Sequence, residues 1–174
     1  MKRLLALVAV LAIAAPVSAA TVDGMRIQSA VAGAGNQTVI LVHGWTCDSS
    51  SWDAQVPVLA RKYRVITIDL PGHGKSDSPK DGKFSMDLFA RAVEAVRAEA
   101  KVDKVVLVGH SMGAPVIRQY ARRFPRHVAG LDSFEARPRF TACRAPLRTV
   151  RPRPSSPKPA AHDRATIVHS HSGD

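Results

Sequence analysis

The sequence has few aromatic residues, few cysteines and no series of long apolar segments. Of 174 residues, nine are aromatic and two are cysteines. So few large rings predict a core built mainly from aliphatic side chains. With 45% apolar and 22% charged residues, the composition is that of one soluble globular domain. It excludes collagen, a coiled coil and a polytopic membrane protein.

Acidic residues are also scarce: 14 Asp and Glu stand against 25 Lys and Arg, a net charge of +11. Residues 1–20 carry two basic groups and no acid (+2), residues 21–134 carry 15 and 11 (+4), and residues 135–174 carry 8 and 3 (+5). The excess therefore lies mostly at the two ends. Because the central part is only mildly cationic, we expect no nucleic-acid partner.

Residues 1–20 have the organisation of a secretory signal peptide. Two basic residues precede an apolar run over residues 4–15, and small residues follow Pro16. The alternative, a membrane anchor, needs about 20 apolar residues, and this run is shorter. We expect export to the periplasm or the medium, cleavage after Ala19 or Ala20, and no stable membrane association afterwards.

Residues 38–124 alternate between aliphatic runs and amphipathic segments. The runs at 39–42, 65–68 and 105–108 lack polar alternation, which is typical of strands covered on both faces. Helical spacing follows the second and third runs, at Phe89, Ala92, Val93 and Val96 and at Val116, Ile117, Tyr120 and Phe124. The predicted fold class is α/β, an open, mainly parallel sheet with flanking helices and right-handed crossovers. Ser85 is the predicted N-cap of the first helix, and residues 22–32 are predicted to form a β-hairpin.

A GxSxG pattern, Gly109, His110, Ser111, Met112 and Gly113, joins the third run to its helix. In this pattern a sharp strand-to-helix turn presents the serine hydroxyl above the carboxyl edge of the sheet. The glycines are needed because a Cβ beside so tight a turn would strike the neighbouring backbone. The alternative is a glycine-rich turn with a bystander serine. The buried strand before it and the amphipathic helix after it favour a nucleophile.

Two further segments make the chain similar to the α/β-hydrolase family. His43, Gly44 and Trp45 end the first strand as the family's HGxx oxyanion segment does, and residues 69–76 match its DxPGxGxS turn. The resemblance covers roughly residues 22–131. A serine at the elbow resembles the serine hydrolases of the family, not its dehalogenases or epoxide hydrolases.

The resemblance implies a role for each motif residue. Ser111 is the nucleophile, and the backbone N–H groups of Trp45 and Met112 form the oxyanion hole, worth about 3 to 4 kcal/mol each in acyl transfer. The implied activity is cleavage of an ester, thioester or amide of a small molecule through an acyl-enzyme, with no cofactor and no metal. The residues expected to shape the motifs are His43, Gly44, Gly109, His110 and Gly113.

The remaining polar and aromatic residues near the motifs have structural interpretations. Neither His43 nor His73 is expected to be the base, because both lie in motif turns, and the ring of His110 should face away from the serine hydroxyl. Asp69 is predicted to accept backbone N–H groups of the following turn. Trp52 is predicted to pack on the sheet.

The two cysteines, Cys47 and Cys143, lie in different settings. Cys47 is interpreted as a small buried residue near the site. In the oxidising compartment that export implies, the two could pair, and the sequence leaves both that pairing and the oligomeric state open.

Residues 135–174 form a different kind of segment. They hold six of the chain's 12 prolines and eight of its 25 basic residues, with neither a strand nor a helix period. We predict disorder from about residue 136. The bias toward Arg, Pro, Ala and Ser is typical of a GC-rich gene read out of register, so our hypothesis is a frameshift product that lacks the native second half of the domain.

The catalytic acid and histidine of the family follow the nucleophile in chain order. The downstream candidates are His162, Asp163, His169, His171 and Asp174. None has the expected setting at a strand end, so the acid and the base stay unassigned. Two hypotheses remain open: an exported serine hydrolase that is inactive or crippled in this form, and a non-catalytic product whose basic tail binds anionic surfaces.

Overall fold

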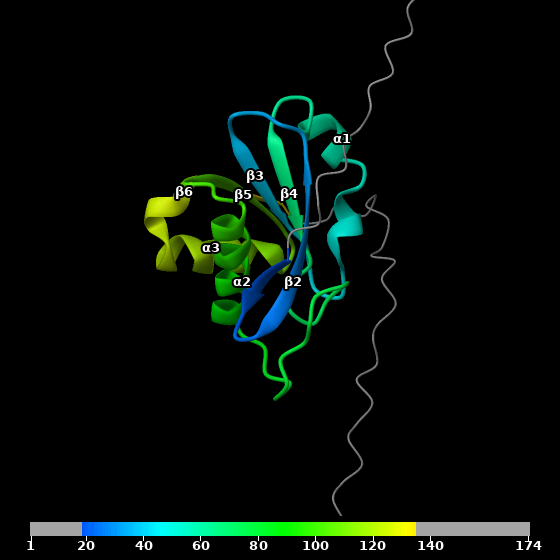
Figure 1. Ribbon diagram of the computed structural model, residues 1–174, viewed down its shortest axis with the longest axis vertical. Coiled ribbons are helices and arrows are strands. Elements are labelled where there is room, and N and C mark those ends of the chain that lie inside the picture. Colours follow the sequence, from blue (N-terminus) through cyan, green and yellow to red (C-terminus); the bar gives the residue numbers. More distant parts are fainter. Residues whose placement is uncertain (1–18, 135–174) are drawn as a thin grey trace, which may run out of the picture.

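The computed structural model describes residues 19–134, which form one mixed sheet with helices on both faces (Figure 1). The strand order is β1-β2-β4-β3-β5-β6. The strands are β1 (Ala19–Val22), β2 (Met25–Ala32), β3 (Thr38–Val42), β4 (Arg64–Ile68), β5 (Val105–His110) and β6 (Val128–Phe134). The helices are α1 (Val56–Leu59), α2 (Met86–Glu99) and α3 (Gly113–Arg123), with 3₁₀ turns η1 (Ser49–Trp52) and η2 (Pro125–His127). The predicted α/β class is confirmed.

The predicted hairpin is present as β1 and β2. Val22 pairs with Met25, and both residues between them, Asp23 and Gly24, have positive φ angles of 49° and 74°. This two-residue turn matches the right-handed twist of the strands it joins. Because β2 also pairs antiparallel with β4, the hairpin extends the parallel part of the sheet.

The four remaining strands are parallel and reverse their winding direction next to β3. The connection from β3 to β4 runs through α1, and the connection from β4 crosses over β3 to β5 through α2. When successive crossovers share one hand, such a reversal places the helices on opposite faces. In this chain α1 covers one face, while α2 and α3 cover the other (Figure 1).

Side-chain alternation along β3 fills a separate core on each face. Ile40 and Val42 point into the larger core with α2 and α3, and Val39 and Leu41 point into the smaller one with η1 and α1. All five residues of β3 are buried. This double burial is why the strand appears in the sequence as an uninterrupted aliphatic run.

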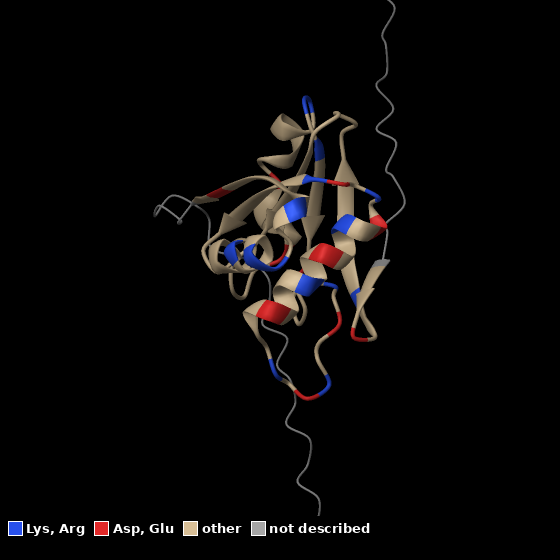
Figure 2. Ribbon diagram, turned by 90° about the vertical axis from the view of Figure 1, so that its left-hand side faces the viewer, with Lys and Arg blue, Asp and Glu red and all other residues tan. Residues whose placement is uncertain are grey.

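Helix α2 begins where its cap predicts. The Ser85 hydroxyl accepts a hydrogen bond from the Leu88 N–H at 3.1 Å, as an N-cap does. Charges of both signs alternate along this helix (Figure 2). Arg91 pairs with Asp87 at 3.1 Å and with Asp23 of the hairpin turn at 2.5 Å, so the ion pairs tie α2 to the β1–β2 hairpin.

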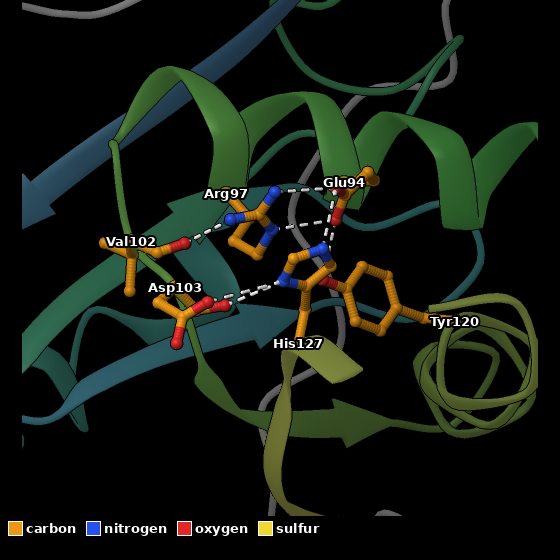
Figure 3. A network of polar contacts seen from close by, with 6 residues as sticks. All are labelled: Glu94, Arg97, Val102, Asp103, Tyr120 and His127. Atoms are coloured by element: carbon orange, nitrogen blue, oxygen red, sulfur yellow. Dashed lines mark hydrogen bonds and ion pairs between the residues drawn. The ribbon is translucent and has the colours of Figure 1, made fainter. Parts of the chain in front are cut away.

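A polar network joins α2 to α3 (Figure 3). Glu94 accepts a hydrogen bond from the Tyr120 hydroxyl at 2.8 Å and pairs with Arg97 at 2.7 Å. Burial opposes ionisation of Glu94, but these two partners outweigh it and lower the pKa of the carboxyl. Burial and the same hydrogen bond raise the pKa of the Tyr120 hydroxyl above its usual range. The network fixes the helix that begins at the elbow.

Strand β6 was missed by the sequence patterns. It pairs parallel with β5, from Val105↔Val128 to His110↔Phe134, and forms the edge of the sheet next to β5. Gly130 and Asp132 interrupt the aliphatic run that identified the other strands, and β6 forms because β5 offers a free edge. The connection between β3 and β4 contains only the four-residue helix α1 and the 3₁₀ turn η1, in which Trp52 lies.

Within residues 19–134, no helix is both long and apolar enough to cross a membrane. Residues 1–18 and 135–174, and with them most of the predicted signal peptide and the predicted disordered tail, lie outside the described residues.

Candidate active site

The GxSxG segment forms a sharp turn between β5 and α3. Ser111 has a φ of 51°, the left-handed region that non-glycine residues rarely adopt, and its side chain is exposed. A Cβ added to Gly109 would lie 2.6 Å from the carbonyl carbon of Gly113, and one added to Gly113 would overlap the carbonyl oxygen of Val42. Both glycines are therefore needed for the turn to close against β3, as the sequence predicts.

The segment after β3 lies directly against this turn. A Cβ on Gly44 would lie 3.1 Å from the Cβ of Ser111 and 3.3 Å from Nδ1 of His110. Among residues 19–134, neither the Trp45 nor the Met112 amide donates a hydrogen bond to another group. Two free N–H groups thus flank the exposed serine, the arrangement that oxyanion stabilisation requires.

His43 holds the oxyanion segment in place and is fully buried. Its Nε2 accepts a hydrogen bond from the Leu70 N–H at 3.0 Å, so Nδ1 carries the proton and donates to the Gly44 carbonyl at 2.7 Å. Burial lowers the pKa of His43 to about 4, so the ring is neutral at pH 7. With both ring nitrogens engaged, His43 has a positioning role, as the sequence suggested.

Asp69 performs the same task for the turn after β4. It is buried, and its two carboxylate oxygens accept the N–H groups of Ser49 and Lys75, each at 2.8 Å. The bond to Lys75 confirms the predicted role in the following turn. The bond to Ser49 was not predicted, because it joins segments on two different strands that only the sheet brings together.

The other predicted residues lie near the site in structural settings. Trp52 is buried in the smaller core, as predicted. His73 is buried and its Nδ1 is 3.0 Å from the Pro71 carbonyl. Cys47 is buried and its thiol is not free, while Cys143 lies outside the described residues.

A base for the serine is absent from the described part of the chain. No residue among 19–134 forms a hydrogen bond with the Ser111 hydroxyl, and no three His, Cys, Asp or Glu side chains there form a metal-binding group. The downstream candidates, His162, Asp163, His169, His171 and Asp174, all lie outside the described residues.

Phe84 is a site-edge residue that sequence reasoning missed. Its ring is 41% exposed and lies 6.2 Å from the Trp45 ring, centroid to centroid. Gly72, with a φ of 79°, leaves room for it. An aromatic residue just before a helix N-cap, in a chain with few aromatics, was the available signal.

We predict that Gly113→Ala destabilises the protein by roughly 1 to 3 kcal/mol, because its methyl group overlaps the Val42 carbonyl. Gly130→Ala is the matched control, since its nearest neighbour would be Val106 Cγ2 at an ordinary 3.6 Å. Urea unfolding of both variants measures the effect. Equal stabilities would contradict the close approach of α3 to β3.

We predict that buried, neutral His43 makes stability depend on pH. The unfolded ring titrates at 6.5 and the folded one at about 4, so its contribution is complete above pH 6.5 and decreases as the pH falls toward 4. The loss from this group is about 3 kcal/mol. Urea unfolding between pH 7 and 5 should show that the free energy of unfolding of His43→Gln changes less with pH than that of the wild type. An equal pH dependence in the two proteins would refute the assignment.

Several known proteins are similar to this chain in sequence. A family model described as alpha/beta hydrolase fold matches residues 37–153, which continues past the boundary at residue 134 expected from composition. A pimeloyl acyl-carrier-protein methyl ester esterase of Methylococcus capsulatus is 42% identical over 105 residues, covering 60% of this chain and 39% of that protein. The dihydrolipoyllysine-residue acetyltransferase component of the acetoin cleaving system of Cupriavidus necator is 38% identical over 109 residues, covering 63% and 29%.

Solved structures agree with the sequence matches. Est816, described as an N-acyl homoserine lactone degrading enzyme, has a TM-score of 0.64 and 31% identity, covering 67% of this chain and 44% of its own. The epoxide hydrolase CorEH has a TM-score of 0.63 and 30% identity, covering 68% and 41%. The chain thus spans less than half the length of these relatives. The family model matches well over half of the chain, which therefore belongs to the α/β-hydrolase fold family.

Proposed function

We propose that the protein is a serine hydrolase that cleaves an ester, thioester or amide of a small molecule through an acyl-enzyme on Ser111. The observation that carries the proposal is the elbow itself, an exposed serine at positive φ beside the Trp45 and Met112 amides, which have no acceptor among residues 19–134. The Ser111 oxygen attacks the carbonyl carbon, and the bond to the leaving group breaks. The leaving group takes up the serine proton, and water then releases the acid. A carboxylate nucleophile of the epoxide-hydrolase type is disfavoured by the serine at this position.

We further propose that this chain acylates slowly. A hydroxyl without a general base keeps its high pKa, and loss of a triad member lowers the rate by about 10⁴ to 10⁶. The support is that both ring nitrogens of His43 are engaged and that Nδ1 of His73 contacts the Pro71 carbonyl. The sequence around His162, His169 and His171 also lacks the strand-end setting of a catalytic histidine.

Labelling with a fluorophosphonate tests both proposals. We expect slow modification that maps to Ser111 and is lost in Ser111→Ala, whereas the exposed Ser133→Ala labels as the wild type does. Added imidazole, a diffusible general base, should accelerate the reaction several-fold.

The outcomes separate the two proposals. Fast labelling without imidazole would contradict the slow acylation but keep the serine hydrolase. No labelling of Ser111 with or without imidazole, in folded protein, would reject the hydrolase and favour the non-catalytic hypothesis.

We also propose that the protein is exported, on the basic start and short apolar run of residues 1–20. Ala20 is buried and pairs with Ile27 in β1, so cleavage after Ala19 keeps a residue of the hairpin that cleavage after Ala20 removes. We expect protein recovered outside the cytoplasm to have the mass of a chain starting at Ala20. An Asp in place of Val8 should retain the precursor inside. Full-length protein found only in the cytoplasm would contradict export.

A further inference from the structure

A group of three aromatic rings, two of them exposed, lies beside the proposed oxyanion hole. The Trp45 ring is 53% exposed and lies edge-on to the rings of His73 and Phe84, with centroid distances of 5.1 and 6.2 Å. We call these three side chains the aromatic rim. Exposed aromatic surface of this kind, in a chain with so few aromatics, indicates a binding role.

The rim is held rigidly in place. Phe84 stacks on the buried Phe89, with centroids 6.0 Å apart and ring planes at 26°. A Cβ on Gly72 would lie 2.6 Å from Phe84 Cε1, so the backbone of this turn contacts the ring closely. His73 contacts both Phe89 and Trp45. The rings therefore form a continuous row from the larger core to the surface.

The rim begins at the reacting atoms. Trp45 supplies the proposed oxyanion N–H from its backbone and the first rim ring from its side chain. Gly44, the residue before it, faces the Ser111 Cβ at the close distance given above. A substrate whose carbonyl oxygen accepts the Trp45 N–H is therefore bound at the residue whose ring begins the rim.

The rim offers the surfaces of aromatic rings. The rings that contact Trp45 belong to Phe84 and to His73, whose Nδ1 is taken up by the Pro71 carbonyl. An alkyl or aryl group gains free energy by leaving water for such a surface.

We propose that Trp45 and Phe84 determine specificity by binding the apolar group of the substrate, so that the preferred substrates are carbonyl compounds carrying an alkyl or aryl group of several carbons. The proposal rests on the assignment of Ser111 as the nucleophile. The occupant follows from the continuity of the rim with the oxyanion hole: the group that reaches the rim is attached to the carbonyl held there.

Two ligand series test the rim separately from the nucleophile. n-Alkylboronic acids, from ethyl to octyl, bond to a serine hydroxyl, whereas n-alkyl amides of the same lengths, measured in Ser111→Ala, bind without covalent chemistry. Calorimetry on the full chain should give a Kd that falls about two-fold per methylene in both series, since each CH₂ is about half buried. Trp45→Ala and Phe84→Ala should flatten this dependence. Val58→Ala, a similarly exposed apolar residue on α1, should leave it unchanged.

Conservative variants keep the test valid if the alanine variants unfold. Phe84→Leu retains most of the buried volume but loses the ring, and should reduce the chain-length dependence by about half while melting as the wild type does. A cooperative melt of each variant shows that the fold is intact.

Each result has a separate meaning. If boronates bind the wild type but not Ser111→Ala, and the Kd of the amides does not change with chain length, the rim proposal is overturned and the nucleophile is kept. If the Kd of the amides falls with chain length but boronates bind Ser111→Ala as tightly as the wild type, the nucleophile is rejected and an apolar subsite is kept. Failure of iodide to quench the Trp45 fluorescence in the free protein, measured against Trp45→Phe, would show that another segment covers the rim and would overturn the proposal.

Discussion

The backbone contact between the start of α3 and the end of β3 is the constraint on which the rest of the site depends. Gly113 lies so close to the Val42 carbonyl that no side chain fits there, and a Cβ on Gly44 would lie 3.1 Å from the Ser111 Cβ. These two contacts bring the ends of β3 and β5 together. They fix the distance between the serine hydroxyl and the N–H groups beside it, whatever the rest of the molecule does.

The topology explains why the contact occurs at this edge of the sheet. β3 lies between β4 and β5, and the chain leaves β3 and β5 toward helices on opposite faces. Such a reversal opens a crevice at the carboxyl ends of the strands, where open α/β sheets bind their ligands. Around it, two buried polar groups replace water: His43 and Asp69 accept backbone N–H groups of the flanking loops. Satisfying those donors lets irregular backbone lie buried beside the site.

The aromatic rings near the site lie partly in the core and partly at the surface. Phe89 is buried in the larger core, while Trp45 and Phe84 continue the row into solvent. The core itself is built mainly from aliphatic residues, as the composition indicated. Among the large rings, Trp45 and Phe84 are exposed beside the site, whereas Trp52, Phe89 and Tyr120 are buried.

The sequence by itself determined the three inner strands, the two long helices and the elbow, because each has a local signal: an uninterrupted aliphatic run, a helical period with a cap, or paired glycines about a serine. The lead-in hairpin also follows from its turn residues. Tertiary structure alone decided the rest. β6 forms because β5 offers partners to a strand of weak propensity, Asp69 reaches Ser49 because two loops meet at one edge, and Phe84 contacts Trp45, which lies 39 positions earlier in the sequence. None of these contacts has a periodic pattern, since each depends on the distance between residues in space and not along the chain.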